Sequence, residues 1–421
     1  SIPLLFSSLE NVREALRHKI VRAIVQILGG KGLSLLAAKS QERMRTYMLD
    51  TLSDNDEDIL MASLQGLSAI GTDECSGPII DMTAALDKDR QDELYEAAIK
   101  AIAAIGYNDA VRSALASQEE ARIMLAMEAC HLMADRRCVP DLKQIFWNVS
   151  HELQRMAAAE LAMLGDCEDS SFFVTIMNDS EDAEVIKSAL VFFGNHPTCP
   201  DVEDLVFAQI DHKYVDVKEM ALEACINLHS PQLNELFKMR AKSEDPMQRM
   251  MAVYALGRYS IVDNLAEITA ALDDASPRTR QVAVEAFLNL GEQAEECLPL
   301  LLPRLADEDK DVRLAVIDLL GQLGSPTVLP YILNALNDEN EWVRIRAIDA
   351  LGMHRVADAV PELAQMLESA SPMVALKIVE ALGKIGGNVA FSVLLGMMNH
   401  EDSEIQHAAE EALAMIQAEQ E

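Results

Sequence analysis

The stretch "DEDKDVRLAVIDLLGQLG", residues 307–324, returns in closely similar form as "DENEWVRIRAIDALG", residues 338–352. Both copies contain an acidic turn, a Val-Arg pair, apolar residues three and four positions apart, and a closing glycine. Apolar residues at that spacing lie on one face of an α-helix. The two stretches therefore predict the same element twice, an acidic turn followed by an amphipathic helix.

The pattern continues along most of the chain. The Val position recurs with a constant spacing of 31 residues, at Val312, Val343, Val374 and Ile405. The basic position recurs toward the N-terminus with similar spacing, at Arg280, Arg249, Lys218, Lys187, Arg155 and Arg122. Fainter copies surround Leu60, Tyr95 and Arg22, so about twelve units cover nearly the whole sequence.

Each unit has the pattern of two helices joined by the acidic turn. The apolar segment "VLPYILNALN", residues 328–337, forms the first helix, and the second ends at a glycine suited to a left-handed C-cap. Two such helices bury too little apolar surface alone, so neighbouring units must stack. Low aromatic, Gly and Pro content also favours helix. We predict an all-α fold, a right-handed α-α superhelix of about twelve helical hairpins.

Charge distinguishes the N-terminal end from the rest. Residues 1–50 carry eight basic and four acidic side chains, whereas the whole chain has a net charge of −34. We predict basic capping helices over residues 1–50 and a single continuous solenoid over residues 51–421, most regular from residue 240 onward. The basic end is either a solvated cap or a surface for an acidic partner, including self-association with a second copy.

An aspartate in the turn precedes the arginine of the second helix by six positions in three units: Asp274 with Arg280, Asp307 with Arg313, and Asp338 with Arg344. In this the chain resembles the HEAT-like repeat family, especially the short bacterial repeats also found in phycobilin lyase subunits. The resemblance implies a structural ladder, in which the Asp caps the second helix and bonds to the Arg of a neighbouring repeat. Ser243, Ala375 and Gln406 interrupt the pattern.

A second row of acids lies within the second helices, five residues after the basic position: Glu160, Glu223, Glu285, Asp318, Asp349, Glu380 and Glu411. Because the offset is constant, these side chains should occupy the same helix face and form a line. The line is either the ordinary solvent-facing side of each repeat or, with Tyr254, Arg346 and His407, a surface for a basic or amphipathic protein segment. Association of that kind weakens with salt.

The sequence gives little support for catalysis or for a cofactor. His151-Glu152 and His400-Glu401 are two pairs, too few for the four His-Glu pairs implied by resemblance to the di-iron deoxyhypusine hydroxylases. Phosphate-binding glycine loops and nucleophile elbows are absent. We predict no metal, no cofactor and no catalytic residue. A bilin lyase-type subunit is the alternative, and a His-Glu hydroxylase a less favoured one.

The remaining composition concerns partners and location. An excess of 69 acidic over 35 basic residues excludes nucleic acid as a partner, because binding to a polyanion needs cations. Seven dispersed cysteines without a Cys-x-x-Cys pair argue against a disulfide framework. No membrane span or export signal is apparent, which favours the cytoplasm. The prediction is a bacterial, non-enzymatic scaffold or adaptor whose acidic, concave surface binds protein partners.

Overall fold

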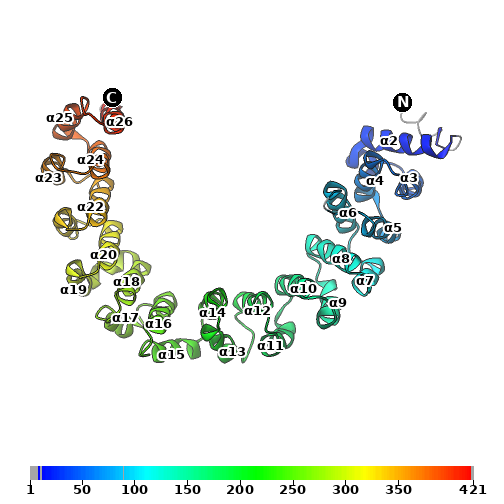
Figure 1. Ribbon diagram of the computed structural model, residues 1–421, viewed down its shortest axis with the longest axis horizontal. Helices are drawn as coiled ribbons and strands as arrows, with labels where there is room; N and C mark the ends of the chain where they lie inside the picture. The colour runs from blue at the N-terminus through cyan, green and yellow to red at the C-terminus, as the bar shows by residue number, and fades with distance from the viewer. Residues whose placement is uncertain (1–7, 10–11, 89, 419–421) are drawn as a thin grey trace. The chain divides into compact units, whose positions relative to one another are not determined.

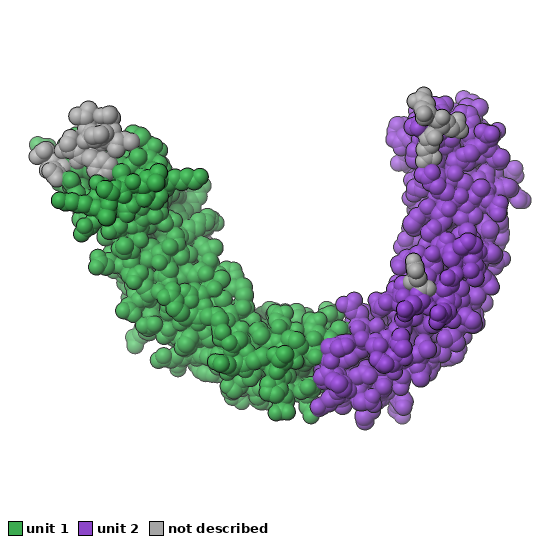
Figure 2. Space-filling view, turned by 180° about the vertical axis from the view of Figure 1, so that it is seen from behind, with its two compact units in different colours: residues 1–228 green, residues 229–421 purple. Residues whose placement is uncertain are grey.

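The structure is a computed structural model that describes residues 8–9, 12–88 and 90–418. These residues form α-helices and short 3-10 helices, with no β-strand in the described ranges. They divide into two compact units, unit 1 (residues 1–228) and unit 2 (residues 229–421), which Figure 2 colours separately. The predicted all-α class is confirmed.

Unit 1 begins with the long helix α2 (Glu14–Ser34), which packs on α3 and α4. Six hairpins follow, and their first helices are α3 (Ala38–Thr51), α5 (Asp73–Ala84), α7 (Asp109–Leu115), α9 (Val139–Ile145), α11 (Ser170–Asp179) and α13 (Glu203–Ala208). Their second helices are α4 (Glu57–Ile70), α6 (Asp92–Ile105), α8 (Glu120–Met133), α10 (His151–Leu164), α12 (Ala183–Asn195) and α14 (Val215–Leu228).

Unit 2 contains six further hairpins. Their first helices are α15 (Pro231–Arg240), α17 (Leu265–Ala271), α19 (Leu298–Leu301), α21 (Leu329–Asn334), α23 (Val360–Met366) and α25 (Gly387–Met397). Their second helices are α16 (Pro246–Tyr259), α18 (Pro277–Ala286), α20 (Lys310–Leu323), α22 (Glu341–Met353), α24 (Pro372–Ile385) and α26 (Ser403–Ala418). Within the described residues, α3 to α26 therefore make twelve hairpins, and the predicted helical-hairpin solenoid is confirmed.

The second helices form one layer of each unit. In unit 2 each of them packs on the next, from α16 to α26, while the first helices lie on the other side of the stack (Figure 1). Apolar residues at the repeat positions, among them Val312, Val343 and Val374, are buried between the layers. Within unit 2 the core is thus a layer of apolar contacts that no hairpin could form alone.

Glycines stand at two positions near the end of the second helix, three residues apart, and the two positions have different roles. Gly324 adopts the left-handed conformation (φ 56°, ψ 11°) at the end of α20, as predicted for a C-cap. Gly352 instead lies inside α22, and a Cβ atom there would stand 2.9 Å from the backbone of Ala381 on α24. The predicted C-cap is therefore wrong for Gly352, whose small size permits close helix packing. The same approach recurs at Gly257 with Ala286, Gly321 with Ala350, and Gly383 with Ala412.

A ladder of charged hydrogen bonds joins successive turns of unit 2. Arg280 donates two hydrogen bonds to the Asp307 carboxylate of the next hairpin, at 2.8 and 2.7 Å. It donates a third, at 2.9 Å, to the backbone carbonyl of Asp274 in its own turn. Both side chains are buried, with 8% of Arg280 and 4% of Asp307 exposed. Such a pair is stable in the interior only because the guanidinium and the carboxylate satisfy each other.

The ladder extends on both sides of this pair and then stops. Arg249 binds Asp274 at 2.7 Å and Arg313 binds Asp338 at 2.8 Å. Arg344 reaches only backbone carbonyls, those of Asp338 and Glu339, at 2.8 and 3.1 Å. Ser369 stands one repeat after Asp338, where the next carboxylate would be needed. In unit 1 the basic residues pair with acids at other positions of the next hairpin: Arg155 with Asp182, the N-cap of α12, and Lys187 with Asp216 in the first turn of α14.

The turn aspartate organises the turn without capping the helix. Asp307 accepts a hydrogen bond from the backbone N–H of Asp309 at 2.9 Å, and Asp309 accepts one from Asp311 at the start of α20. The implied capping role of Asp307 is therefore wrong, because Asp309 is the N-cap. Asp274 and Asp338 make the equivalent bond to Ser276 and Asn340, the N-caps of α18 and α22.

No helix among the residues described is both long enough and apolar enough to cross a membrane.

The ladder predicts that Asp307→Asn lowers the free energy of unfolding by about 3–5 kcal/mol, because it leaves the buried Arg280 without a counter-charge. Asp311→Asn is a matched control, since that carboxylate is half exposed on the first turn of α20. The control should lose at most about 1 kcal/mol. Urea unfolding of the full chain, followed by circular dichroism, measures both. Equal losses would contradict a special role for the ladder.

The ladder also predicts a dependence of stability on pH. Hydrogen bonds from Arg249 lower the pKa of Asp274. Burial acts to raise the pKa of Asp307, but Arg280 and the N–H of Asp309 outweigh it and lower that pKa. Because both pKa values are lower in the folded chain, their stabilisation is complete above about pH 4 and is lost as pH falls through the folded values. As the pH decreases from about 6 to about 3, the urea concentration at the unfolding midpoint should fall less steeply for Asp307→Asn than for the natural sequence. Parallel curves for the two proteins would refute this.

Candidate protein-binding surface

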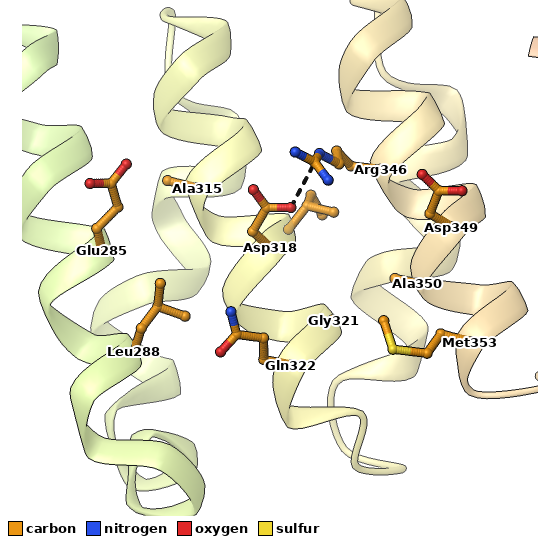
Figure 3. A pocket seen from close by; sticks show the side chains of 11 residues that line it. Glu285, Leu288, Ala315, Asp318, Gly321, Gln322, Arg346, Asp349, Ala350 and Met353 are labelled. Atoms are coloured by element: carbon orange, nitrogen blue, oxygen red, sulfur yellow. Dashed lines mark ion pairs between the residues drawn. The ribbon is translucent and has the colours of Figure 1, made fainter. Parts of the chain in front are cut away.

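The predicted binding residues of unit 2 all lie on its second helices. Tyr254 is on α16, Glu285 on α18, Asp318 on α20, Arg346 and Asp349 on α22, Glu380 on α24, and Glu411 on α26. The ladder keeps the starts of α18, α20 and α22 in the same register, so equivalent positions project from the same side. Figure 3 shows Glu285, Asp318 and Asp349 on three neighbouring helices. We call the acids at these positions, Glu285, Asp318, Asp349, Glu380 and Glu411, the acidic row.

The acidic row borders a cavity of about 420 Å³ that spans α18, α20 and α22. Glu285, Asp318, Asp349 and Arg346 supply its charged lining (Figure 3). Its apolar and small lining residues are Leu288, Ala315, Ile317, Gly321, Ala350 and Met353, and Gln322 adds an amide. The cavity therefore offers carboxylates beside apolar surface, a combination that suits a side chain with a long apolar stem and a cationic end.

Asp318 lies in an environment that disfavours its charged form. Its carboxylate is half buried, and this burial raises its pKa, while Arg346 acts in the opposite direction. The Arg346 guanidinium lies 3.4 Å from the carboxylate, and more than half of the Arg346 side chain is exposed. An exposed ion pair contributes little to stability, so Arg346 does not fully offset the cost of desolvating the Asp318 carboxylate. A cation placed closer to the carboxylate would reduce that cost.

Cations and polar groups of the chain itself are interleaved with the other acids. Lys377 binds Glu380 at 2.7 Å, and Glu380 is the main cause that raises the pKa of Lys377, with Asp349 as a smaller contributor. Gln281 donates a hydrogen bond to Glu285 at 2.7 Å. His407 lies 3.4 Å from Glu411. The row is therefore partly neutralised, and its free negative potential is smaller than its number of acids suggests.

Exposed apolar side chains accompany the acids. Tyr254 occupies the position of the row at which the other units of this region have an acid, and it is exposed. Met353 is 64% exposed at the edge of the cavity. These residues give the surface an amphipathic character, which matches the predicted amphipathic partner.

Unit 1 departs from the predicted line of exposed acids. Glu223 is exposed, but Glu160 is only 4% exposed and its carboxylate lies 2.7 Å from His131. Burial raises the pKa of Glu160, and the hydrogen bond with His131 acts against it. The expectation of a solvent-facing acid is wrong for Glu160, which is buried and contacts His131 of the neighbouring helix α8.

The described residues contain no group of three or more His, Cys, Asp or Glu side chains placed to hold a metal ion. His151 and Glu152 begin α10 in unit 1, and His400 and Glu401 precede α26 in unit 2. The two His-Glu pairs thus belong to different units.

Sequence reasoning missed the cavity-lining residues that follow the row along each helix. Leu288, Gln322 and Met353 come three or four positions after Glu285, Asp318 and Asp349, respectively. Positions three and four apart share a helix face. The spacing that identified the row would have identified these residues as well.

Comparisons with known proteins agree with this architecture. The family profile described as HEAT repeats matches residues 203–287, 265–336 and 329–414, which together span half of the chain. No curated protein matches the sequence. Solved structures with a similar fold include the karyopherin Kap121p bound to the extreme C-terminus of the protein phosphatase Cdc14p, with a TM-score of 0.62 and 12% identity. Yeast importin-β (Kap95p) has a TM-score of 0.54 and 12% identity.

These alignments cover almost all of this chain but not all of the larger proteins. The match to Kap121p covers 95% of this chain and 52% of that one, and the match to Kap95p covers 97% and 67%. The chain therefore spans about half the length of Kap121p. At this level of identity the likeness concerns the fold alone.

The perturbed environment of Asp318 predicts that Asp318→Asn does not destabilise the protein. The change removes a half-buried charge, and the only ion pair that it breaks is the one with the exposed Arg346. The free energy of unfolding should therefore stay within about 1 kcal/mol of the natural value. Urea unfolding at neutral pH tests this, with Asp307→Asn as the destabilising reference. A loss above about 2 kcal/mol would make Asp318 a structural residue.

Proposed function

Because the chain belongs to the HEAT-repeat family, in which stacked hairpins build extended surfaces, we propose that it is a protein-binding scaffold or adaptor without catalytic activity. The acidic row of unit 2 holds a basic or amphipathic segment of the partner. The observation that carries the proposal is the half-buried Asp318 carboxylate in a cavity with both acidic and apolar walls.

Charge complementarity supports a cationic partner segment. The chain has a net charge of −34, so a basic segment is attracted at long range before it makes contact. At short range an incoming Lys or Arg displaces Arg346 from Asp318, and its apolar stem lies against Met353 and Leu288. Each such contact is weak, and repetition of the hairpins supplies several of them.

Proteins with a similar fold provide independent support. Kap121p has been solved bound to Pho4p and to the extreme C-terminus of Cdc14p, so in that protein the fold receives protein ligands. We carry over only this use of the fold, the binding of another protein. The chemistry of the bound segment is inferred from the acidic row of this chain.

The N-terminal end provides a second proposed surface. Lys19, Lys31 and Lys39 are exposed, whereas Arg22 is already paired with Asp58 at 2.6 Å. We propose that residues 1–50, which extend into α3 of the first hairpin, form the basic N-terminal cap of the solenoid and that their exposed lysines meet an acidic surface, including one on a second copy. A bacterial cytoplasmic location is proposed from the composition and the seven free cysteines.

The scaffold proposal predicts that charge reversal in the row weakens binding. The triple variant Asp318→Lys, Asp349→Lys and Glu380→Lys should bind a synthetic amphipathic peptide of lysine and leucine about tenfold or more weakly. Three attractive contacts become repulsive in this variant. Fluorescence anisotropy of the labelled peptide measures the affinity, which should also fall as sodium chloride increases.

The matched control reverses three exposed acids outside the row, Asp263, Asp358 and Glu401, and so makes the same change in net charge. This control should lose much less affinity than the row variant. Equal losses would mean that net charge governs binding and that the row does not. A peptide of glutamate and leucine should not bind to the natural chain.

A further inference from the structure

Two cysteines that are far apart in the sequence meet in unit 1. Cys167 is the first residue of the 3-10 helix η3 (Cys167–Asp169), just after α10, and Cys199 lies in the loop between α12 and α13. Their Sγ atoms are 2.7 Å apart, although the residues are separated by 32 positions. A disulfide bond measures about 2.05 Å, so the two sulfurs would have to approach by only about 0.7 Å.

The two cysteines bracket one complete hairpin. Helices α11 and α12 lie between them in the sequence, and their interface includes Phe173 stacked on Phe192 at 3.9 Å between ring centroids. A bond between the cysteines would join the two ends of this hairpin. Cross-links that close a loop of this kind restrict the unfolded chain and oppose local opening.

The loop that contains Cys167 is also tied to the preceding hairpin. Asp166 pairs with Arg136 at 2.5 Å, and Asp169 pairs with Lys143. Asp169 additionally accepts the backbone N–H of Asp166 at 2.9 Å. Because these contacts hold the loop, the Cys167 sulfur is kept beside Cys199 in the folded protein.

The two thiols differ in accessibility. Cys167 is partly exposed, and the Thr198 hydroxyl lies 3.4 Å from its sulfur. Cys199 is only 4% exposed, and burial, followed by its contact with Cys167, raises the pKa of Cys199 to about 12. A small molecule in solution therefore reaches Cys167 first, and Cys199 is placed to react second.

We propose that Cys167 and Cys199 form a reversible disulfide by exchange with a small disulfide such as oxidised glutathione, and that this bond locks hairpin α11/α12 closed. The Cys167 thiolate attacks one glutathione sulfur and releases one glutathione thiolate. The Cys199 thiolate then attacks the Cys167 sulfur of the mixed disulfide and releases the second. The two protein thiol protons pass to the released thiolates, so one disulfide is reduced for each one formed.

Another cysteine pair provides an internal comparison. Cys130 lies beside Cys138, and this contact together with burial raises the pKa of Cys130. Both residues are fully buried, at 0% exposure, so a dissolved disulfide has no access to them in the folded protein. Folded protein should therefore oxidise at Cys167 and Cys199 and remain reduced at Cys130 and Cys138.

The test is native oxidation of the full chain with oxidised glutathione, followed by nonreducing digestion and mass spectrometry. The expected product is a peptide cross-linked between Cys167 and Cys199 that has lost two hydrogens. This cross-link lowers the number of free thiols from seven to five. Cys167→Ser and Cys199→Ser should each abolish it. Cys297→Ser, which removes another partly exposed thiol, should leave it unchanged.

A second measurement uses the natural sequence and does not depend on the folding of any variant. Amide hydrogen exchange in α11 and α12 should slow by about tenfold or more on oxidation and recover with dithiothreitol. The proposal is overturned if oxidation stops at a glutathione adduct on Cys167, if the cross-link appears only in denaturant, or if exchange in this hairpin does not change.

Discussion

The buried guanidinium that joins one turn to the next is the interaction on which the register of α18, α20 and α22 depends. Arg280 contacts the backbone of its own turn and the carboxylate of the next, so a single side chain fixes the distance between two hairpins. Two charges removed from water are costly unless their hydrogen bonds are complete, which restricts the turn to the few conformations that place Asp307 correctly. The same restriction keeps α18 and α20 in register and therefore aligns Glu285 with Asp318.

The end of the ladder shows what else holds the stack. Beyond Arg344 the ladder position holds Ser369 and then His400 in place of an aspartate, yet α22, α24 and α26 still pack in sequence. Gly352 and Gly383 face Ala381 and Ala412 at distances that leave no room for another side chain. Close backbone contact over a small residue increases the dispersion attraction between helices. Polar bonds and close packing are thus alternative ways to join one hairpin to the next in this chain.

The repeat could be predicted from the sequence because the same residue types recur every 31 residues, and this spacing can be read without knowledge of any spatial contact. It did not predict which partner each repeated residue meets, since that partner lies one repeat away. Gly352 occupies the repeat position of Gly321, inside the helix, whereas the position of Gly324 is held by Arg355 in the next repeat, and both Gly324 and Arg355 have a positive φ. Glu160 and Asp318 share an offset, yet 5% of the Glu160 side chain and 41% of the Asp318 side chain are exposed. Cys167 and Cys199 are one repeat apart, a signal that a search for Cys-x-x-Cys cannot detect.

The two kinds of aspartate in unit 2 also show why counts of acidic residues are a poor guide to binding. The Asp307 carboxylate accepts hydrogen bonds from Arg280 and from the backbone N–H of Asp309, so its charge is compensated within the fold. Asp318 has one exposed partner and a raised pKa, so its charge is only partly compensated. A partner gains most by supplying a cation where the fold has left that compensation incomplete, because relief of a desolvation cost adds to the attraction. In the proposed complex, a partner segment therefore competes with Arg346 and Lys377 for these acids. A segment that cannot displace them is attracted only by the net charge of the chain, which salt screens.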